Sequence, residues 1–413
     1  MYLKLAWRNI WRNRRRTLIT VSSVTFAVFF AISMRSVAEG SYEQMIDNMA
    51  RFHTGFIQIQ DQRFEEEPSL DNAIPYDQAF AEHIAGADER IDHLVPRVEA
   101  YMLVSGDDIT RGGLVLGIDP EKEQQLNELK NNLTEGRFFT MDDESLIIGQ
   151  GFARRMNVNV GDTLVLLGQG RFGMSAAGKY PVTGIVHHPL TDLDNQIVYL
   201  PLPVAQWLLS AEGHLTSLLV TPREARHVEG VAGALREEVA EYNERSDEYK
   251  LVVRTWPEMM PELLQAIEFD RSSLLFITGI LYVVIAFGLF GTILTMTLER
   301  MREFGVLLSV GMQRLQLAGV VFIETFFISV LGVIAGFMLS YPLLIWFRHN
   351  PVKLTGDAAE AMLEFGVEPI MPVSMAPQVF YSQMLVVFAI ALAVSLYPTL
   401  KLIRLNILEA ART

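Results

Sequence analysis

Four long apolar stretches dominate the pattern of hydrophobic and polar positions along this chain. They cover residues 17–40, 271–298, 315–347 and 379–400, and no charged residue occurs between Ser272 and Leu298. A helix needs about 20 mostly apolar residues to cross the hydrocarbon core of a bilayer, and each stretch meets that length. The pattern therefore predicts four membrane-spanning helices.

A polar block at residues 41–270 separates the first two apolar stretches. Short apolar runs recur through it between Gly, Asp and Pro residues, at a spacing typical of β-hairpins. The expected strands cover residues 56–60, 114–118, 146–148, 163–167, 182–186, 197–200 and 251–254. Amphipathic spacing predicts helices at 78–84, 223–242 and 257–271. We expect a large α+β domain with a β-rich lobe inserted at about residues 105–215.

Composition supports a membrane protein and narrows its class. Half of the 413 residues are hydrophobic, 20% are charged, and the mean hydropathy is +0.24, whereas soluble domains usually carry about 25% charged residues. The chain has no cysteine, which excludes disulfides, thiolate metal sites and cysteine nucleophiles. The net charge of −14 argues against a nucleic-acid binder, since phosphate binding needs a basic surface.

The uneven distribution of charge predicts an orientation in the membrane. Residues 41–270 contain 39 acidic and 18 basic residues, whereas the remainder contains 9 and 16. Basic residues near the ends of spans mark the cytoplasmic side. They gather in residues 1–16, 299–314 and 401–413, whereas the loop at 348–378 is mainly acidic. We therefore expect the first three segments in the cytoplasm, and the large domain and the acidic loop outside it.

The first 16 residues have the pattern of a helix that lies on a membrane surface. Leu3, Trp7, Ile10 and Trp11 recur at helical spacing, and basic residues occupy the other positions. The basic start followed by an apolar run also resembles an export signal. No A-x-A-type cleavage site follows it, so a retained anchor is expected.

One segment resembles a nucleotide-binding loop without its chemistry. Residues 173–179 match the first seven positions of a P-loop. Tyr180, however, stands where a Ser or Thr hydroxyl would bind Mg²⁺, and Pro181 begins an expected strand where a helix should hold phosphate. We expect a hairpin tip at this place.

His187 and His188, with Asp192 and Asp194 nearby, are the one group that resembles a metal site. A metal site needs several ligands that converge in space, and neighbouring residues of a strand project in different directions. A surface loop is the favoured interpretation. The sequence contains no clear catalytic motif, so no catalytic residue, cofactor site or metal site is expected.

Glu324 is an acidic residue inside the third apolar stretch. Such a residue is a functional hypothesis by default. It follows Arg314 by 10 residues, which is about 15 Å along a helix. A structural ion pair and a role in handling substrate or protons are both open interpretations.

Small residues recur at intervals of four in two of the spans. Ser23, Ala27 and Ala31 share one face of the first span, and Gly332 and Gly336 share a face of the third. Such faces allow helix backbones to approach closely. The contact can lie within one chain or between two copies.

The most specific motif is ERMREFGVLLSVGM at residues 299–312. Charged residues come first, apolar residues follow, and a glycine stands at the expected end of a helix. The motif resembles the E-R-x-x-E-[IFV]-G-[IV]-L-x-[AS]-[IV]-G signature of FtsX/MacB-like ABC transporter permeases. Weaker matches to that family are LAWRNI at 5–10, RLNILEA at 404–410, and EGR, IIG and VGD at 135–137, 147–149 and 160–162.

The resemblance implies a non-catalytic permease that forms a dimer and binds two copies of a separate ATPase subunit. The 299–312 segment would be a coupling helix in a groove of that ATPase. The ATPase would bind ATP and Mg²⁺, and this chain would bind no cofactor. The family moves its outer domains without passing cargo through the bilayer, which is called mechanotransmission. The implied location is the bacterial inner membrane, with the large domain in the periplasm.

With no fused ATPase and one large loop, the chain is most similar to the lipoprotein-releasing LolC/LolE branch. That branch implies extraction of lipoprotein or lipid-like cargo, with a second permease copy or paralogue and a periplasmic or lipoprotein partner. MacB-type efflux or peptide export, and FtsX-like control of a cell-wall hydrolase, remain alternatives. The coupling motif disfavours a receptor or anchor that works without an ATPase.

Two sets of site residues follow from the resemblance. The ATPase-coupling interface is expected at Glu299, Arg300, Arg302, Glu303, Phe304, Gly305, Leu308 and Gly311. A cargo cavity between spans one and two is expected at Phe26, Phe29, Phe30, Phe276, Ile280 and Val284, with ordinary helix packing as the alternative.

Overall fold

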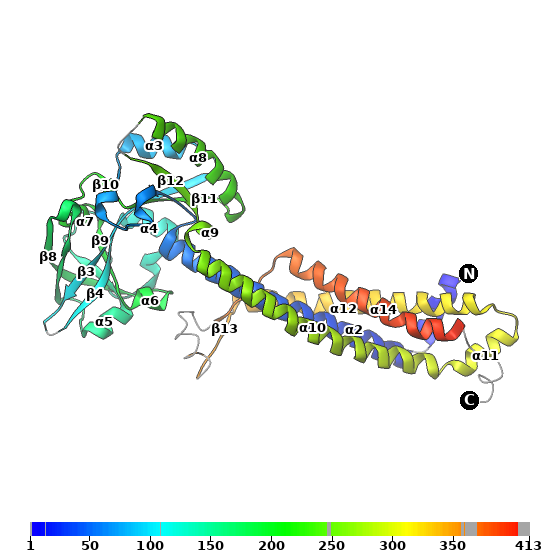
Figure 1. The fold of residues 1–413 in the computed structure, drawn as a ribbon. Helices are drawn as coiled ribbons and strands as arrows, with labels where there is room; N and C mark the ends of the chain where they lie inside the picture. Colours follow the sequence, from blue (N-terminus) through cyan, green and yellow to red (C-terminus); the bar gives the residue numbers. More distant parts are fainter. Residues whose placement is uncertain are drawn as a thin grey trace. The chain divides into compact units, whose positions relative to one another are not determined.

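The computed structural model describes residues 2–12, 14–107, 109–245, 249–356, 359 and 370–403 (Figure 1). The chain divides into two compact units. The helical unit comprises residues 1–44, 265–353 and 370–413, and the sheet unit comprises residues 45–264 and 354–369. The chain passes from one unit to the other within helices α2 and α10.

The helical unit contains the four predicted spans, each on one long helix. Its helices are α1 (Tyr2–Arg12), α2 (Arg14–Met49), α10 (Pro261–Leu298), α11 (Met301–Ser309), α12 (Arg314–His349) and α14 (Pro377–Ile403). Helices α2, α10, α12 and α14 are long and apolar enough to cross a membrane. Most of them begin or end outside the apolar stretches, because the polar sequence that flanks these stretches is also helical.

Short strands β13 (Val352–Lys353) and β14 (Ile370–Met371) pair between α12 and α14. Most of the residues that separate them, and with them much of the expected loop at 348–378, lie outside the described residues. The same holds for residues 404–413, which include the RLNILEA motif.

Glycines allow α12 to pack closely against α2. A Cβ atom built on Gly332 would lie 2.5 Å from the Cβ of Val24, and one built on Gly336 would lie 2.7 Å from the Cβ of Val28. Both valines are buried, as is Ala27 between them. The glycine face of the third span therefore packs within the chain, against the face of the first span that carries Val24 and Val28.

The sheet unit is built on one ten-stranded sheet with the order β12-β1-β11-β3-β4-β9-β6-β8-β5, in which β7 also pairs with β3 and β8. The strands are β1 (Ile57–Asp61), β3 (Ile91–Ser105), β4 (Thr110–Ile118), β5 (Leu133–Gly136), β6 (Leu146–Gly149), β7 (Thr163–Gln169), β8 (Ser175–Val186), β9 (Ile197–Pro201), β11 (Ser217–Pro222) and β12 (Leu251–Thr255). A separate pair is formed by β2 (Ile74–Pro75) and β10 (His214–Leu215).

Helices of the sheet unit are α3 (Gln78–Gly86), α4 (Pro120–Asn127), α5 (Gln150–Met156), α6 (Thr191–Asp194), α7 (Leu202–Leu208), α8 (Val228–Arg245) and α9 (Trp256–Met259). A π-helical turn, η1 (Ala50–Thr54), follows α2 directly. Each expected strand overlaps an observed one. The segment at 105–215 joins the rest of the sheet through β3, which pairs with β4 on one side and with β11 and then β7 on the other.

The segment that resembles a P-loop forms part of a β-hairpin, as expected. Ser175 to Lys179 lie on β8 and pair with β7. The strand continues to Val186, so no helix follows the lysine.

The surface-loop interpretation was wrong for His188, which is buried. Asp194 fixes this segment by accepting hydrogen bonds from the backbone N–H groups of Gly151 (2.7 Å) and His188 (2.9 Å). Burial lowers the pKa of His188 to about 3, so the imidazole is a neutral part of the core. Among the described residues, no three His, Asp or Glu side chains are grouped to hold a metal ion.

Replacing Gly336 by leucine should lower the melting temperature of the purified protein, because a Cβ there already overlaps Val28. Overpacking of this kind costs about 1–3 kcal/mol. Gly319→Leu is the matched control, since Gly319 lies on the same helix and no atom lies within 4 Å of its built Cβ. Equal melting temperatures for the two variants would contradict a close contact between α2 and α12.

Candidate functional site

The coupling motif forms the short connection between α10 and α12. Glu299 and Arg300 make a tight turn between the end of α10 and the start of α11. Beyond α11, Gly311 has a φ of +104°, a conformation that glycine adopts without a steric penalty. The predicted glycine stop is therefore present, and it lets the chain enter α12.

One face of α11 packs into the helical unit. Phe304 and Leu308, one helical turn apart, are buried against Leu317, Val321 and Leu402. Gly305 is buried beside Phe304. This apolar contact holds α11 against the first turns of α12 and the end of α14.

A buried ion pair also connects the turn before α11 to α12. Nη1 of Arg300 donates to both carboxylate oxygens of Glu324 at 2.7 Å. The two side chains are only 3% and 1% exposed. The guanidinium also lies over the ring of Phe304, 5.1 Å from its centroid. A charge removed from water in this way requires its partner, so the turn before α11 is tied to α12.

Exposed ion pairs connect this turn and α11 to the N-terminal helices. Arg12 of α1 contacts Glu303 at 2.7 Å, and Arg16 of α2 contacts Glu299 at 2.7 Å. Exposed pairs contribute about 0–1 kcal/mol each. They orient α1 and α2 at the turn, whereas the buried pair and the apolar contact hold α11 in place.

Four of the eight residues expected at the coupling interface are buried within the chain, and four are exposed. The side chains of Arg300, Phe304 and Leu308 are buried in the helical unit, and Gly305 is buried beside them, so these residues do not face a partner in this arrangement. Arg302 and Glu303 are exposed, as are Glu299 and Gly311. The exposed face of α11 continues through residues that sequence reasoning missed, namely Val306, Leu307 and Val310.

The spacing of the missed residues could have pointed to a second apolar face of α11. Val306 and Val310 are 61% and 83% exposed although they are apolar, and they lie four residues apart on one helical face. The buried Phe304 and Leu308 follow the same spacing two positions earlier. Only the packing of α11 against α12 decides which of the two apolar faces is covered.

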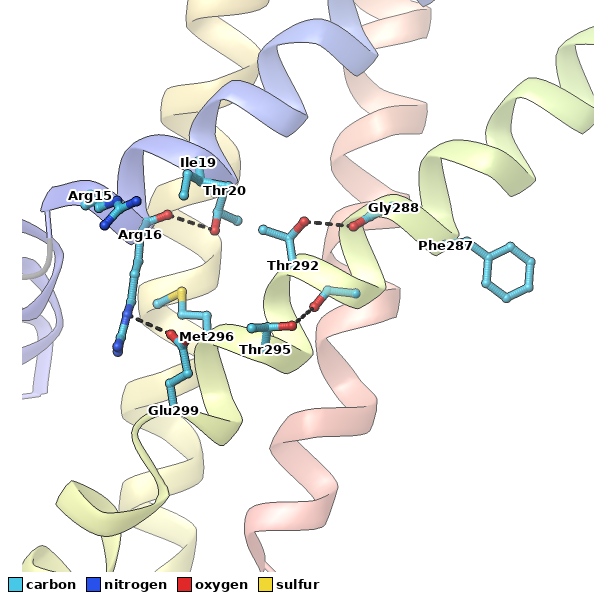
Figure 2. Close-up of a pocket in the computed structure, with 11 residues that line it drawn as sticks. Arg15, Arg16, Ile19, Thr20, Phe287, Gly288, Thr292, Thr295, Met296 and Glu299 are labelled. Atoms are coloured by element: carbon cyan, nitrogen blue, oxygen red, sulfur yellow. Dashed lines mark hydrogen bonds and ion pairs between the residues drawn. The ribbon is translucent and has the colours of Figure 1, made fainter. Parts of the chain in front are cut away.

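The expected cargo residues lie on open faces of α2 and α10. Phe26, Phe30, Phe276, Ile280 and Val284 are exposed, and Phe29 is half-buried with its ring against Phe30. None of these six residues lines the groove described next. A groove of about 700 Å³ lies instead nearer the α10–α11 turn, between α2 and α10 (Figure 2). It is lined by Arg15, Arg16, Ile19, Thr20, Phe287, Gly288, Gly291, Thr292, Thr295, Met296 and Glu299.

Two family models match the sequence of this chain, one mainly over the large domain and one over the helical unit. Residues 17–238, more than half of the chain, match the MacB-like periplasmic core domain. Residues 275–407 match the C-terminal part of FtsX-like permeases. The chain belongs to the FtsX/MacB-like family of ABC transporter permeases. The predicted resemblance is thereby confirmed, and the protein is a membrane permease with a periplasmic-type core domain.

Relatives of this permease include two that combine an ATP-binding part with a permease part. The macrolide export ATP-binding/permease protein MacB of Burkholderia pseudomallei is 21% identical over 360 residues. The pyoverdine export ATP-binding/permease protein PvdT of Pseudomonas putida is 23% identical over 354 residues. Each match covers 82% of this chain and 51% of the relative, so the chain spans about half the length of these proteins.

A third relative, the uncharacterized ABC transporter permease MJ1507 of Methanocaldococcus jannaschii, is 20% identical over 362 residues, which is 82% of each chain. Among solved structures, the periplasmic region of MacB from Actinobacillus actinomycetemcomitans is 14% identical. That match covers 55% of this chain and 98% of that one, with a TM-score of 0.37. The extracellular domain of YknZ from Gram-positive bacteria is 13% identical. That match covers 48% of this chain and 99% of the YknZ domain, with a TM-score of 0.34.

Replacing Glu324 by alanine should destabilise the permease by about 3–5 kcal/mol. The buried charge of Arg300 would lose its 2.7 Å partner and keep only a 3.6 Å contact with Glu303. The double variant Arg300→Met/Glu324→Leu should recover most of this loss, since apolar pairs often replace buried ion pairs at little cost. Unfolding in detergent, followed by circular dichroism, measures both effects. A Glu324→Ala variant as stable as the parent would contradict the buried pair.

Proposed function

We propose that this permease converts ATP hydrolysis by a separate ATPase subunit into movement of its large extracytoplasmic domain. The observation that carries the proposal is the connection of the two long helices to neighbouring strands. Helix α2 leads through η1 into β1, and β12 leads through α9 into α10. Strands β1 and β12 pair along their length, with Ile57 opposite Thr255. Motion of either helix therefore acts on the same edge of the sheet.

A buried charge anchors the end of α2 within the sheet unit. Arg97 of β3 donates from Nη1 to the backbone carbonyl of His53 in η1 at 2.6 Å. Its guanidinium also pairs with Glu123 of α4 at 2.5 Å, and both side chains are almost fully buried. The π-helical turn is thus held by β3, the strand that joins the two halves of the sheet. This anchor supports transmission of force from α2 to the whole domain.

The start of α10 is anchored by a different contact. Glu258 of α9 accepts from the backbone N–H of Thr255 at 2.8 Å and pairs with Arg236 of α8 at 2.9 Å. The backbone N–H of Trp256 also donates to the carbonyl of Phe56 at 3.0 Å. The junctions of both long helices are therefore linked to each other by a backbone hydrogen bond.

The exposed face of α11 is the proposed contact with the ATPase. It combines the charged side chains of Arg302 and Glu303 with the apolar side chains of Val306, Leu307 and Val310. Binding of ATP and Mg²⁺ would be the task of the ATPase. A push on α11 would reach α12 through Arg300 and Glu324, and α10 through the turn at Glu299.

The proposed assembly contains two permease copies, or one copy and a paralogue, with two ATPase subunits. The proposed location is the bacterial inner membrane. The distribution of basic residues supports an orientation with both termini and α11 in the cytoplasm. The sheet unit then lies in the periplasm, where a lipoprotein or another periplasmic protein would be the partner.

Lipoprotein or another lipid-like molecule is the proposed cargo. Only 6% of the most apolar part of α10 is buried within the chain. Exposed aromatic residues such as Phe30 on α2 and Phe276 on α10 offer surfaces for acyl chains, whose burial is favourable by about 0.8 kcal/mol per CH₂ group. Export of small molecules is the second candidate, because two relatives are named for macrolide and pyoverdine export.

Replacing Val306 by aspartate should abolish co-purification of the ATPase and its stimulation by the permease, because a charge would enter the apolar part of the contact. Val160→Asp is the matched control, since Val160 is an exposed valine of the sheet unit. Both measurements use the complex isolated from its native membrane. Normal ATPase binding and turnover in Val306→Asp would contradict the assignment of the α11 face.

Photo-crosslinking groups at Phe30 and Phe276 should capture lipoprotein or lipid during ATP turnover. The same group at Met338, an exposed residue of α12, should capture bulk phospholipid alone. Mass spectrometry of the adducts identifies the captured molecules. Adducts between permease copies only, at both positions, would contradict a cargo role for these residues.

A further inference from the structure

The groove between α2 and α10 is lined by charged, polar and apolar side chains (Figure 2). Arg15, Arg16 and Thr20 come from α2, and Thr292 and Thr295 come from α10. Two glycines of α10, Gly288 and Gly291, also line the groove. No atom lies within 4 Å of a Cβ atom built on either of them, so the chain itself leaves this space unfilled.

The charged groups of the groove favour an anion. Arg16 is paired with Glu299 at 2.7 Å, whereas Arg15 makes no ion pair within the part of the chain that the structure describes. With two arginines and one glutamate, the groove carries one net positive charge. A phosphate diester supplies one negative charge and acceptor oxygens that suit guanidinium groups.

The threonines of the groove favour a ligand that also carries hydroxyl groups. Thr292 and Thr295 each donate their hydroxyl hydrogen to a backbone carbonyl one turn earlier, at 2.8 Å. Thr20 does the same toward Arg16 at 3.2 Å. Their oxygen lone pairs remain available, so these side chains accept hydrogen bonds. A glycerol headgroup has hydroxyls that can donate to them.

The position of the groove favours a lipid over a soluble molecule. Arg15 and Arg16 directly precede the uncharged stretch that begins at Thr17, so they lie at the level of lipid headgroups if α2 spans the membrane. Leu18 and Ile19 are exposed next to them, and Phe287 is exposed on α10. A phosphate at the arginines would place acyl chains along these apolar side chains. Basic pockets between membrane helices on the cytoplasmic side bind anionic headgroups in this way.

We propose that this groove binds an anionic phospholipid with a hydroxylated headgroup, namely phosphatidylglycerol, from the cytoplasmic leaflet. The leaflet assignment rests on the orientation under the proposed function. The phosphate contacts Arg15 and Arg16, and the glycerol hydroxyls donate to Thr292 and Thr295. Because Arg16 also pairs with Glu299, the lipid shares a side chain with the turn that leads into α11. A bound lipid would therefore compete with Glu299 for Arg16 and could change the position of that turn.

Native mass spectrometry of the delipidated full-length permease, titrated with phosphatidylglycerol or phosphatidylcholine, tests the proposal. Phosphatidylglycerol should bind more tightly. Arg15→Gln should weaken its binding about fivefold, the factor that one basic residue contributes at an anionic membrane surface. Gly291→Leu, which adds a side chain to the open space at Gly291 without changing the charge, should abolish the preference.

Two matched controls separate the groove from general effects. Arg14→Gln removes a neighbouring charge that does not line the groove, and Gly279→Leu adds the same side chain to an open position elsewhere on α10. Both should bind phosphatidylglycerol like the parent. Equal binding of the two lipids, or equal losses in Arg14→Gln and Arg15→Gln, would overturn the proposal.

Two further results would assign the groove to another occupant and so overturn the proposal. One is full competition by millimolar glycerophosphoglycerol, which lacks acyl chains and would identify a soluble phosphodiester. The other is a disulfide-linked dimer formed by Thr292→Cys, since the chain has no other cysteine and the bond would identify a second copy. The assay contains no ATPase, so a failure of ATPase coupling leaves its outcome unchanged.

Discussion

The ion pair between Arg300 and Glu324 is the constraint on which the coupling end of the helical unit depends. Both side chains are almost fully buried. Loss of Arg300 would leave the carboxylate of Glu324 in a site closed to water, and loss of Glu324 would leave Arg300 only a 3.6 Å contact with Glu303. The pair joins the turn after α10 to α12. The apolar contact of Phe304 and Leu308 holds α11 against α12 as well. Helix α11 is therefore a rigid extension of the helical unit, with one face left open.

Rigid attachment at this end has a counterpart in the sheet unit. There, a second buried pair, Arg97 with Glu123, holds the turn at the end of α2. Strands β1 and β12 bring the junctions of α2 and α10 next to each other. The chain thus has a fixed attachment at each end of its long helices and a sheet edge that receives both of them. This arrangement suits transmission of movement, which needs stiff elements and few joints.

Sequence reasoning succeeded where a local pattern decides the structure and failed where a distant partner decides it. Apolar length and charge predicted the four spans, and the 299–312 motif predicted the family. Strand β3 was missed because Pro96 and Arg97 interrupt its apolar pattern, although Arg97 is buried by its pairing with Glu123. Likewise, the two apolar faces of α11 look alike in the sequence, and only contact with α12 buries Phe304 and leaves Val306 exposed.

A distance measurement between α11 and the far half of α12 tests the rigid attachment most directly. Nitroxide labels at Val306→Cys and Met338→Cys occupy exposed positions, and the chain has no other cysteine. Pulsed electron resonance should give one narrow distance distribution in the parent and a broad one after Glu324→Gln. Distributions of equal width in the two proteins would show that α11 is held without the ion pair.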